Sequence, residues 1–150
     1  MDYKSLGLKI GIELHQELSG HKLFCHCNTD LSEEHKNGEI KRKIRTQAGE
    51  LGSTDIAAAF EKQKNRTFTY TSYAHESCLV ELDEEPIHQI NQDAIKISLE
   101  LSQLLKLHIP SVLCVMRKTI SDGSAISGFQ RTTLVGLGDD LSFIEIPRGR

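Results

Sequence analysis

The stretch from residue 91 to residue 110 has the clearest periodicity in the chain and most restricts its possible folds. Its apolar residues recur at steps of three and four, which is typical of an amphipathic helix. Asn91 is a favourable N-cap, Asp93 suits the first turn, and Pro110 ends the pattern because proline cannot continue a helix. We therefore expect one long helix here. Its apolar face would consist of Ala94, Ile97, Leu101, Leu104 and Leu105.

Strand-like segments surround this helix, and their order predicts the fold class. A second helix, which Ser53 or Thr54 would cap, is expected over residues 55–64. Helices and strands do not alternate regularly, so the order indicates an α+β fold with a mixed, largely antiparallel sheet rather than βαβ units. Residues 31–55 are polar and contain several glycines, which favours an irregular surface segment. The expected strands lie within residues 7–18, 66–73, 77–83, 111–120, 132–140 and 142–146.

Composition narrows the class of protein. The chain has 150 residues, a net charge of −3 and few aromatic residues, which fits one globular domain and argues against a binder that stacks single-stranded bases. Any contact with nucleic acid would need a local basic patch or help from elsewhere. Neither a membrane-spanning apolar run nor a signal peptide is visible, so we expect a cytoplasmic protein. Its four cysteines are then expected to be thiols or metal ligands.

The first expected strand, which contains GIELHQEL, places polar side chains on one face. Glu13, His15 and Glu17 alternate with apolar residues, so their side chains point the same way. A carboxylate and an imidazole two residues apart could converge on a cation, and Mg²⁺ is often held by one or two carboxylates together with nucleotide phosphates. A solvated strand face would give the same pattern. Glu13 and His15 are therefore candidate catalytic and magnesium-binding residues.

Cys25 and Cys27, separated by one residue, could form half of a tetrahedral zinc site. Such a site needs further ligands, and no second closely spaced cysteine pair follows. Cys78, with a histidine or a water molecule, could complete it. The alternative is three reduced cysteines with a structural role. Cys114 lies in the apolar run 111–120, which we expect to be covered on both faces, so its thiol is expected to be buried.

Arg117 and Lys118 end this apolar run and precede the glycine-rich loop DGSAISGFQR. Backbone N–H groups and hydroxyls of such a loop can approach phosphate oxygens closely, and the two cations would offset the negative charge. The sequence contains no P-loop motif, so a nucleotide would be held in another way. A hairpin turn with two solvated cations would also explain the pattern. The loop residues concerned are Gly123, Ser124, Ser127 and Gly128.

The segments GLKIGIELHQEL, KLFCHCNTDL, MRKT and DGSAISGFQR, in this order, resemble the amino-terminal part of the GatB/GatE family. The family contains the E-type subunit of archaeal glutamyl-tRNA(Gln) amidotransferase and the related B-type subunit of bacteria and organelles. Its members share a G-x-E-x-H-x-x-L opening, a C-x-C pair, and an R-K pair followed by G-[FY]-Q. The resemblance covers nearly the whole chain, and the DGS…SGFQRT stretch is closer to the E-type proteins.

The resemblance implies a catalytic cradle domain with a glutamine-synthetase-like fold. In this family, Mg-ATP phosphorylates the γ-carboxylate of a glutamate attached to tRNA(Gln). Ammonia from an asparaginase-like, D-type amidotransferase subunit then gives Gln-tRNA(Gln), so the expected cofactors are ATP and Mg²⁺ and the expected assembly is a hetero-oligomer with that amidase and Glu-tRNA(Gln). The second cysteine pair of the zinc site in the B-type proteins is missing here, which argues against zinc. By resemblance, Glu13 and His15 line the magnesium–nucleotide site. The same cavity would be lined by Arg117, Lys118, Gly128, Phe129 and Gln130.

Family members are several times longer than 150 residues. We therefore expect residues 1–150 to be an incomplete amino-terminal portion of the cradle domain, with later domains and further acidic metal ligands absent, and to be inactive alone. One alternative is a small non-catalytic domain that binds zinc and a tRNA or protein partner. Another is a self-sufficient Mg-ATP binder of a different ligase class.

Overall fold

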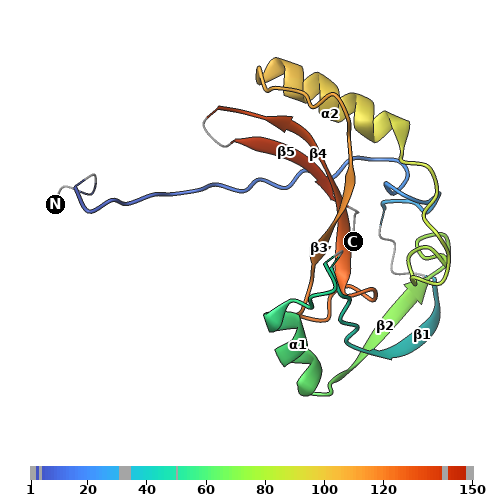
Figure 1. Cartoon of the computed structure of the whole chain (residues 1–150). Coiled ribbons are helices and arrows are strands. Elements are labelled where there is room, and N and C mark those ends of the chain that lie inside the picture. Colours follow the sequence, from blue (N-terminus) through green and yellow to red (C-terminus); the bar gives the residue numbers. More distant parts are fainter. Residues whose placement is uncertain (1–2, 4, 31–34, 50, 140–141, 148–150) are drawn as a thin grey trace.

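The computed structural model describes residues 3, 5–30, 35–49, 51–139 and 142–147 (Figure 1). These residues form two antiparallel sheets and two helices, so the predicted α+β class and the largely antiparallel pairing are confirmed. The expectation of a single mixed sheet is wrong, because the described strands form two sheets and all their pairs are antiparallel. Neither described helix has the length and apolar character needed to cross a membrane. In chain order the elements are β1 (Lys36–Lys43), α1 (Ile56–Gln63), β2 (Thr67–Tyr73), α2 (Gln92–Leu104), β3 (Val115–Thr119), β4 (Phe129–Leu137) and β5 (Phe143–Pro147).

Helix α2 packs against strands β4 and β5 and forms the main core with them (Figure 1). Asn91 caps the helix as predicted, because its side chain accepts hydrogen bonds from the backbone N–H groups of Asp93 and Ala94. The segment before the cysteines adds two further apolar side chains to this core. The buried core residues are Leu23, Phe24, Ala94, Val135 and Ile146.

The predicted apolar face of α2 is largely wrong. Besides Ala94, the helix buries Ser98 and Ser102. Each serine hydroxyl donates a 2.8 Å hydrogen bond to the carbonyl four residues earlier, so it can be buried without water. Small side chains also allow close packing, since a Cβ atom on Gly136 of β4 would lie only 2.6 Å from the Ser102 hydroxyl oxygen. The larger predicted residues are 44–78% exposed: Ile97, Leu101, Leu104 and Leu105.

Strands β1 and β2 form a separate two-stranded ribbon (Figure 1). β2 and α1 agree with the predicted strand and helix, although Asp55 rather than Ser53 or Thr54 caps α1 by accepting a hydrogen bond from Ala58 N–H. The sequence does not predict β1, which lies inside the polar stretch 31–55. Residues 36–43 of that stretch pair with β2, so the expectation of an irregular segment is wrong there.

Strand β4 is the centre of the three-stranded sheet, with β3 and β5 as its antiparallel neighbours. β3 is exposed along its whole length and Cys114 just before it is also exposed, so the predictions of a covered strand and a buried thiol are wrong. The reason is the position of the covering helix, because α2 packs against β4 and β5, the other two strands of this sheet.

Residues 77–83 form turns rather than the predicted strand. The backbone N–H groups of Leu82 and Asp83 donate to the carbonyls of Cys78 and Val80, which closes the chain on itself. Val80 is buried against the cysteines of the amino-terminal segment. Val80 and Cys78 therefore contribute to a small second core instead of joining a sheet, whereas Leu79 is exposed.

Residues 8–17 form an extended arm that points away from the rest of the molecule (Figure 1). The predicted strand over residues 7–18 is wrong, because within the described part of the chain the arm pairs with no strand. A strand requires a hydrogen-bonded neighbour, and an alternating pattern alone does not supply one. The apolar side chains of the arm are 58–89% exposed: Leu8, Ile10, Ile12 and Leu14.

Candidate active site

The β3–β4 hairpin brings two cations to one aromatic ring. Arg117 lies directly opposite Arg131, and Thr119 lies opposite Phe129. Residues two apart on a strand share a face, so both guanidinium groups and the Phe129 ring lie on the same side of the sheet. The guanidinium carbons of Arg117 and Arg131 lie 5.5 and 5.0 Å from the ring centroid, close enough for cation–π attraction. Phe129 thus serves as a platform for a pair of cations.

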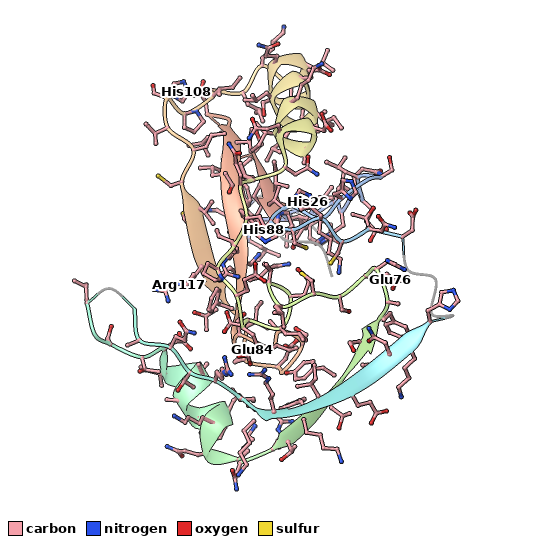
Figure 2. The ribbon with its side chains drawn as sticks, turned by 90° about the vertical axis from the view of Figure 1, so that its right-hand side faces the viewer. His26, Glu76, Glu84, His88, His108 and Arg117 are labelled. Carbon is pink, nitrogen blue, oxygen red and sulfur yellow. The ribbon has the colours of Figure 1, made fainter. Side chains whose placement is uncertain are left out.

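Among the residues that the structure describes, no carboxylate balances the positive charge of Arg117. Arg117 lies between the three-stranded sheet and the ribbon, as does Glu84 (Figure 2). Its Nη1 atom donates a 2.8 Å hydrogen bond to Oε1 of Gln47, which is a neutral partner. Within the described residues Arg117 makes no ion pair, and its side chain is exposed. Its charge is therefore available to an anion.

Lys118 points to the opposite face of the sheet from Arg117, because the two residues are consecutive in a strand. Its Nζ atom lies 3.3 Å from Oε1 of Glu145 in β5. Gln130 is the direct cross-strand partner of Lys118 and shares its face. The hairpin therefore divides the predicted residues, with Arg117 and Phe129 on one face and Lys118 and Gln130 on the other.

The glycine-rich loop between β3 and β4 contacts the ribbon. The hydroxyl of Tyr70 in β2 donates a 2.6 Å hydrogen bond to the carbonyl of Gly123, and burial raises the pKa of this phenol. Ser124 turns back onto Asp122, whose Oδ1 atom accepts hydrogen bonds from the backbone N–H and the hydroxyl of Ser124. The loop is thereby fixed by contacts at its tip.

Gly128 lets the chain pass close to the end of β1. Its φ of 78° lies in the left-handed region, and a Cβ atom there would clash with the carbonyl oxygen of Arg45. The buried Ser127 hydroxyl donates a 2.7 Å hydrogen bond to the carbonyl of Phe129. Gly128 and Ser127 therefore position the start of β4, and a role of Gly128 at a nucleotide stays a prediction.

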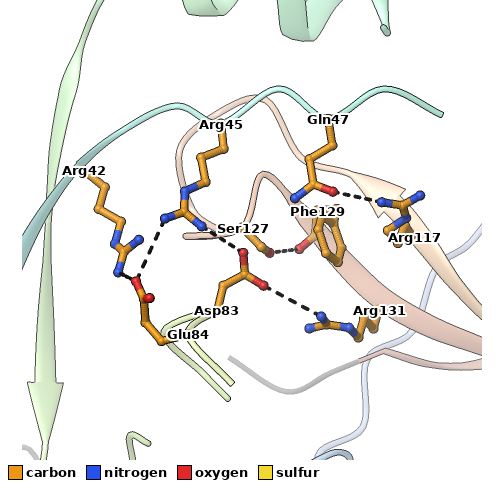
Figure 3. A network of polar contacts seen from close by, with 9 residues as sticks. All are labelled: Arg42, Arg45, Gln47, Asp83, Glu84, Arg117, Ser127, Phe129 and Arg131. Carbon is orange, nitrogen blue, oxygen red and sulfur yellow. Dashed lines mark hydrogen bonds and ion pairs between the residues drawn. The ribbon is translucent and has the colours of Figure 1, made fainter. Parts of the chain in front are cut away.

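An acidic turn, residues 83–84, holds the neighbouring arginines (Figure 3). Oδ2 of Asp83 accepts a 3.0 Å hydrogen bond from Nη1 of Arg45, and Oδ1 of Asp83 lies 3.8 Å from Nη2 of Arg131. Glu84 accepts a hydrogen bond from Arg42, which lowers the pKa of the Glu84 carboxyl. Sequence reasoning assigned neither acid to the site. The run ELDEEP, residues 81–86, is the signal for them, since it could supply metal ligands, but a charged strand end is the commoner explanation of such a run.

Glu13 and His15 lie together on the arm but apart from the hairpin. Nε2 of His15 lies 3.2 Å from Oε1 of Glu13, and their side chains are 79% and 73% exposed. The arm points away from the β3–β4 hairpin, so the structure does not bring this pair to Arg117 (Figure 1). One carboxylate and one imidazole suit Mg²⁺ only when phosphate or water oxygens complete the coordination. The pair could thus contribute to a magnesium–nucleotide site without forming one alone.

The sulfur atoms of Cys25, Cys27 and Cys78 all lie within 4.8 Å of one another. Cys25 and Cys27 are buried, and burial raises the pKa of both thiols. Zinc would favour the opposite protonation state, because it binds thiolates. Three converging sulfur atoms supply three of the four ligands that a structural zinc ion needs, so the donor set fits the ion. The structure thus brings Cys78 close to the pair, and a zinc site at these residues stays a prediction.

A buried ion pair borders the cysteines. Nζ of Lys22, whose side chain is 5% exposed, donates to the carbonyl of Glu76 at 2.7 Å and to Oε2 of Glu81 at 3.1 Å. Oε1 of Glu81 lies 3.7 Å from the sulfur of Cys25. The sequence gives no sign of this arrangement, because Lys22 and Glu81 are 59 residues apart. Glu81 or a water molecule could supply the fourth ligand.

Comparison with known proteins gives one consistent match. The family described as "GatB/GatE catalytic domain" matches residues 8–138. The chain is 46% identical over 147 residues to the E-type subunit of glutamyl-tRNA(Gln) amidotransferase from Saccharolobus solfataricus, which covers 97% of this chain and 23% of the relative. It is 43% identical over 151 residues to the E-type subunit from Methanobrevibacter smithii, and this alignment covers 100% of the chain and 24% of that relative. The chain thus spans about a quarter of the length of these relatives.

Proposed function

The chain belongs to the GatB/GatE catalytic domain family, and we propose that it is the amino-terminal portion of a tRNA-dependent amidotransferase subunit. The proposed activity is the ATP-dependent conversion of Glu-tRNA(Gln) to Gln-tRNA(Gln). The observation that carries the proposal is the extent of the family match, because residues 8–138 include both the GIELHQEL and the SGFQRT segments. In this proposal the chain forms one part of a cradle domain, and residues beyond this chain complete the domain.

The chemistry of amide formation explains why phosphate-binding groups are needed. A carboxylate is a poor electrophile because its leaving group would be oxide. In the proposed reaction an oxygen of the γ-carboxylate attacks the γ-phosphorus of ATP and the bond to ADP breaks, which gives an acyl phosphate. Ammonia then attacks the acyl carbon, phosphate leaves, and a proton is lost from nitrogen to give the amide. Phosphoryl transfer of this kind depends mainly on positioning and on charge neutralisation.

Arg117 is the residue best prepared to neutralise phosphate charge. Its guanidinium group is exposed, rests beside Phe129 and donates to the neutral Gln47. A guanidinium fork suits phosphate oxygens, and its use would not require breaking an ion pair. Lys118, on the other face, would have to leave Glu145 or act on another part of the substrate. The remaining candidates for the nucleotide are Ser124, Gly128, Phe129 and Gln130.

Glu13 and His15 are proposed to act from the arm. Mg²⁺, when bound with ATP, would spread the charge of the phosphate oxygens. The carboxylate of Glu13 is suited to hold that ion, while His15 would contact a phosphate or a metal-bound water, since imidazole is a poor ligand for Mg²⁺. The arm must approach the hairpin for both groups to meet one nucleotide. The ammonia is proposed to come from an asparaginase-like, D-type amidotransferase subunit within a hetero-oligomer.

The test is phosphate release in the full-length protein with Glu-tRNA(Gln), ATP, Mg²⁺ and an ammonium salt as the source of ammonia. We expect the tRNA-dependent release to fall at least about tenfold in Glu13→Ala, because loss of a metal-holding carboxylate weakens a charge-stabilising contact. Glu100→Ala, at an exposed position of α2, is the matched control and should retain full activity. Unchanged release in Glu13→Ala would remove Glu13 from the site.

The cysteine cluster supports a second candidate function. A small domain that binds zinc and a tRNA or protein partner, without catalysis, would explain three converging sulfur atoms. Such a domain would hold one zinc ion tightly and would show no affinity for ATP. Binding of Mg-ATP that is lost in Arg117→Ala would favour the catalytic function over this one.

A further inference from the structure

The outer face of the β1–β2 ribbon carries lysines and threonines in register. Lys41 lies opposite Thr69 and Lys43 opposite Thr67, and all four residues are exposed. The next pair along the same face places Thr71 opposite Glu39. We call Lys41, Lys43, Thr67, Thr69 and Thr71 the basic ribbon face.

The inner face of the ribbon is different. There Tyr70 is hydrogen-bonded to the loop at Gly123, and Arg42 is paired with Glu84. Arg45, which follows β1, is paired with Asp83. The inner cations are thus used within the molecule, and the alternation of the strand directs the remaining ones outward.

The two outward lysines have no acidic partner within the described part of the chain. Nζ of Lys43 donates to Oδ1 of Asn65, a neutral group, and Lys41 makes no ion pair with any residue that the structure describes. Nearby cations are balanced instead, since Lys36 pairs with Glu39, and Glu61 pairs with both Lys64 and Arg66. The basic ribbon face therefore holds two unbalanced charges next to three hydroxyls.

Positive charge is concentrated in one short segment, although the chain as a whole has a net negative charge. Residues 36–45 contain five lysines and arginines and one glutamate, whereas the whole chain has a net charge of −3. An open hollow of about 460 Å³ runs along residues 40–45, and four of its six lining residues are cationic. A local basic surface on an acidic protein is a footprint of a polyanionic partner.

We propose that the basic ribbon face binds the phosphate backbone of a structured RNA. Lysines and threonines are both common donors to phosphate oxygens. Lys41 and Lys43 are two residues apart on one strand, a separation of about 6.7 Å that is similar to the spacing of successive phosphates along an RNA strand. The choice of RNA among polyanions rests on the proposed function, whose substrate is a tRNA. Binding at this face adds affinity without reading base sequence.

The experiment compares the full-length protein with its Lys41→Gln/Lys43→Gln variant. The probe is a tRNA transcript that carries no amino acid. Dissociation constants are measured by filter binding between 50 and 200 mM NaCl. Each lost phosphate contact should make the slope of log affinity against log salt shallower by about one, and the two together should weaken binding about tenfold or more at the lower salt. Lys41→Arg/Lys43→Arg should bind as tightly as the unmodified protein.

The matched control is Lys96→Gln/Lys106→Gln, which makes the same charge change at exposed positions of α2 and just after it, at the other end of the molecule (Figure 1). Its affinity and salt slope should be unchanged. If the ribbon variant binds with the affinity and slope of this control, or if the unmodified protein does not bind the transcript, the proposal is overturned. Weakened RNA binding by the ribbon variant would uphold the RNA-binding proposal even if the protein transfers no phosphate. Failure of this proposal is therefore distinguishable from failure of the proposed reaction.

Discussion

Arg117 of β3 lies directly opposite Arg131 of β4, and the two like charges are brought together on one side of the hairpin. Two features make this arrangement tolerable. The ring of Phe129 lies within 5.5 Å of both guanidinium carbons, and Asp83 balances the charge of Arg131. The guanidinium group of Arg131 is therefore used in an ion pair within the molecule, whereas that of Arg117 can bind an anion.

Replacement of the shared ring should weaken nucleotide binding. In Phe129→Leu, Arg117 loses a cation–π contact worth about 0.5–1 kcal/mol, so we expect KM for ATP to rise roughly two- to fivefold with a smaller change in kcat. Steady-state phosphate release measures both. Phe143→Leu, at an exposed position of β5, is the control and should leave KM unchanged. Equal KM values in the two variants would show that the ring does not support Arg117.

Removal of the negative charge at Asp83 should destabilise the fold. The side chains of Asp83 and Arg131 are 17% and 16% exposed, so Asp83→Asn removes a counter-charge from a largely buried cation, at a cost of about 1–3 kcal/mol. Asparagine is the suitable replacement because Asp83 has a φ of 57°, which asparagine tolerates. Urea unfolding measures the change. In a double-mutant cycle with Arg131→Gln, a coupling energy near zero would contradict the contact.

A side chain at Gly128 should cost more than backbone strain alone. Gly128→Ala adds a clash with the Arg45 carbonyl to the strain of a left-handed residue, and we expect a loss of about 2–4 kcal/mol in the free energy of unfolding. Gly52→Ala is the control, because Gly52 has a similar φ of 76° and open space around it, so its loss should be about 1 kcal/mol. Similar losses in both variants would exclude the clash.

The cysteine cluster should bind one zinc ion. Metal analysis after dialysis, followed by chelator competition, should show that Cys78→Ser weakens zinc binding at least about hundredfold, since a lost ligand should cost no less than a lost supporting residue. Cys114→Ser, at an exposed cysteine, should bind zinc normally. Without metal, the buried Cys27 thiol, whose pKa is raised by burial, should react with iodoacetamide far more slowly than Cys114. Zinc-free protein, or normal binding by Cys78→Ser, would contradict this.

Local signals predicted the elements that local interactions stabilise. α2 begins at its Asn91 cap because the cap is formed within four residues, and β2 follows from its threonine–aromatic alternation. β1 could not be predicted in this way. Arg42 can occupy an inward-facing position of β1 because Glu84, 42 residues further along the chain, supplies the counter-charge. The division of Arg117 from Lys118 follows from strand geometry, once the strand is known.

The two largest errors have one physical cause. The arm has the alternation of a strand, but pairing requires a neighbour, which the described part of the chain does not offer. The stretch around Val80 is apolar enough for a strand, but it is used to cover Cys25 and Cys27. In both cases the outcome depends on partners distant in sequence. For the same reason the meeting of Glu13 with Arg117 stays a prediction.

The most direct measurement is a trapping experiment with hydroxylamine. The full-length protein is incubated with Glu-tRNA(Gln), ATP and Mg²⁺ without ammonia, and the amino acid released from the tRNA is analysed. An acyl phosphate on the side chain would react with hydroxylamine to give the γ-hydroxamate of glutamate and phosphate. We predict an ATP-dependent γ-hydroxamate that falls at least about tenfold in Glu13→Gln, as expected for loss of a charge-stabilising group. A γ-hydroxamate that forms equally without ATP, or none with ATP present, would contradict phosphoryl transfer to the tRNA-bound glutamate.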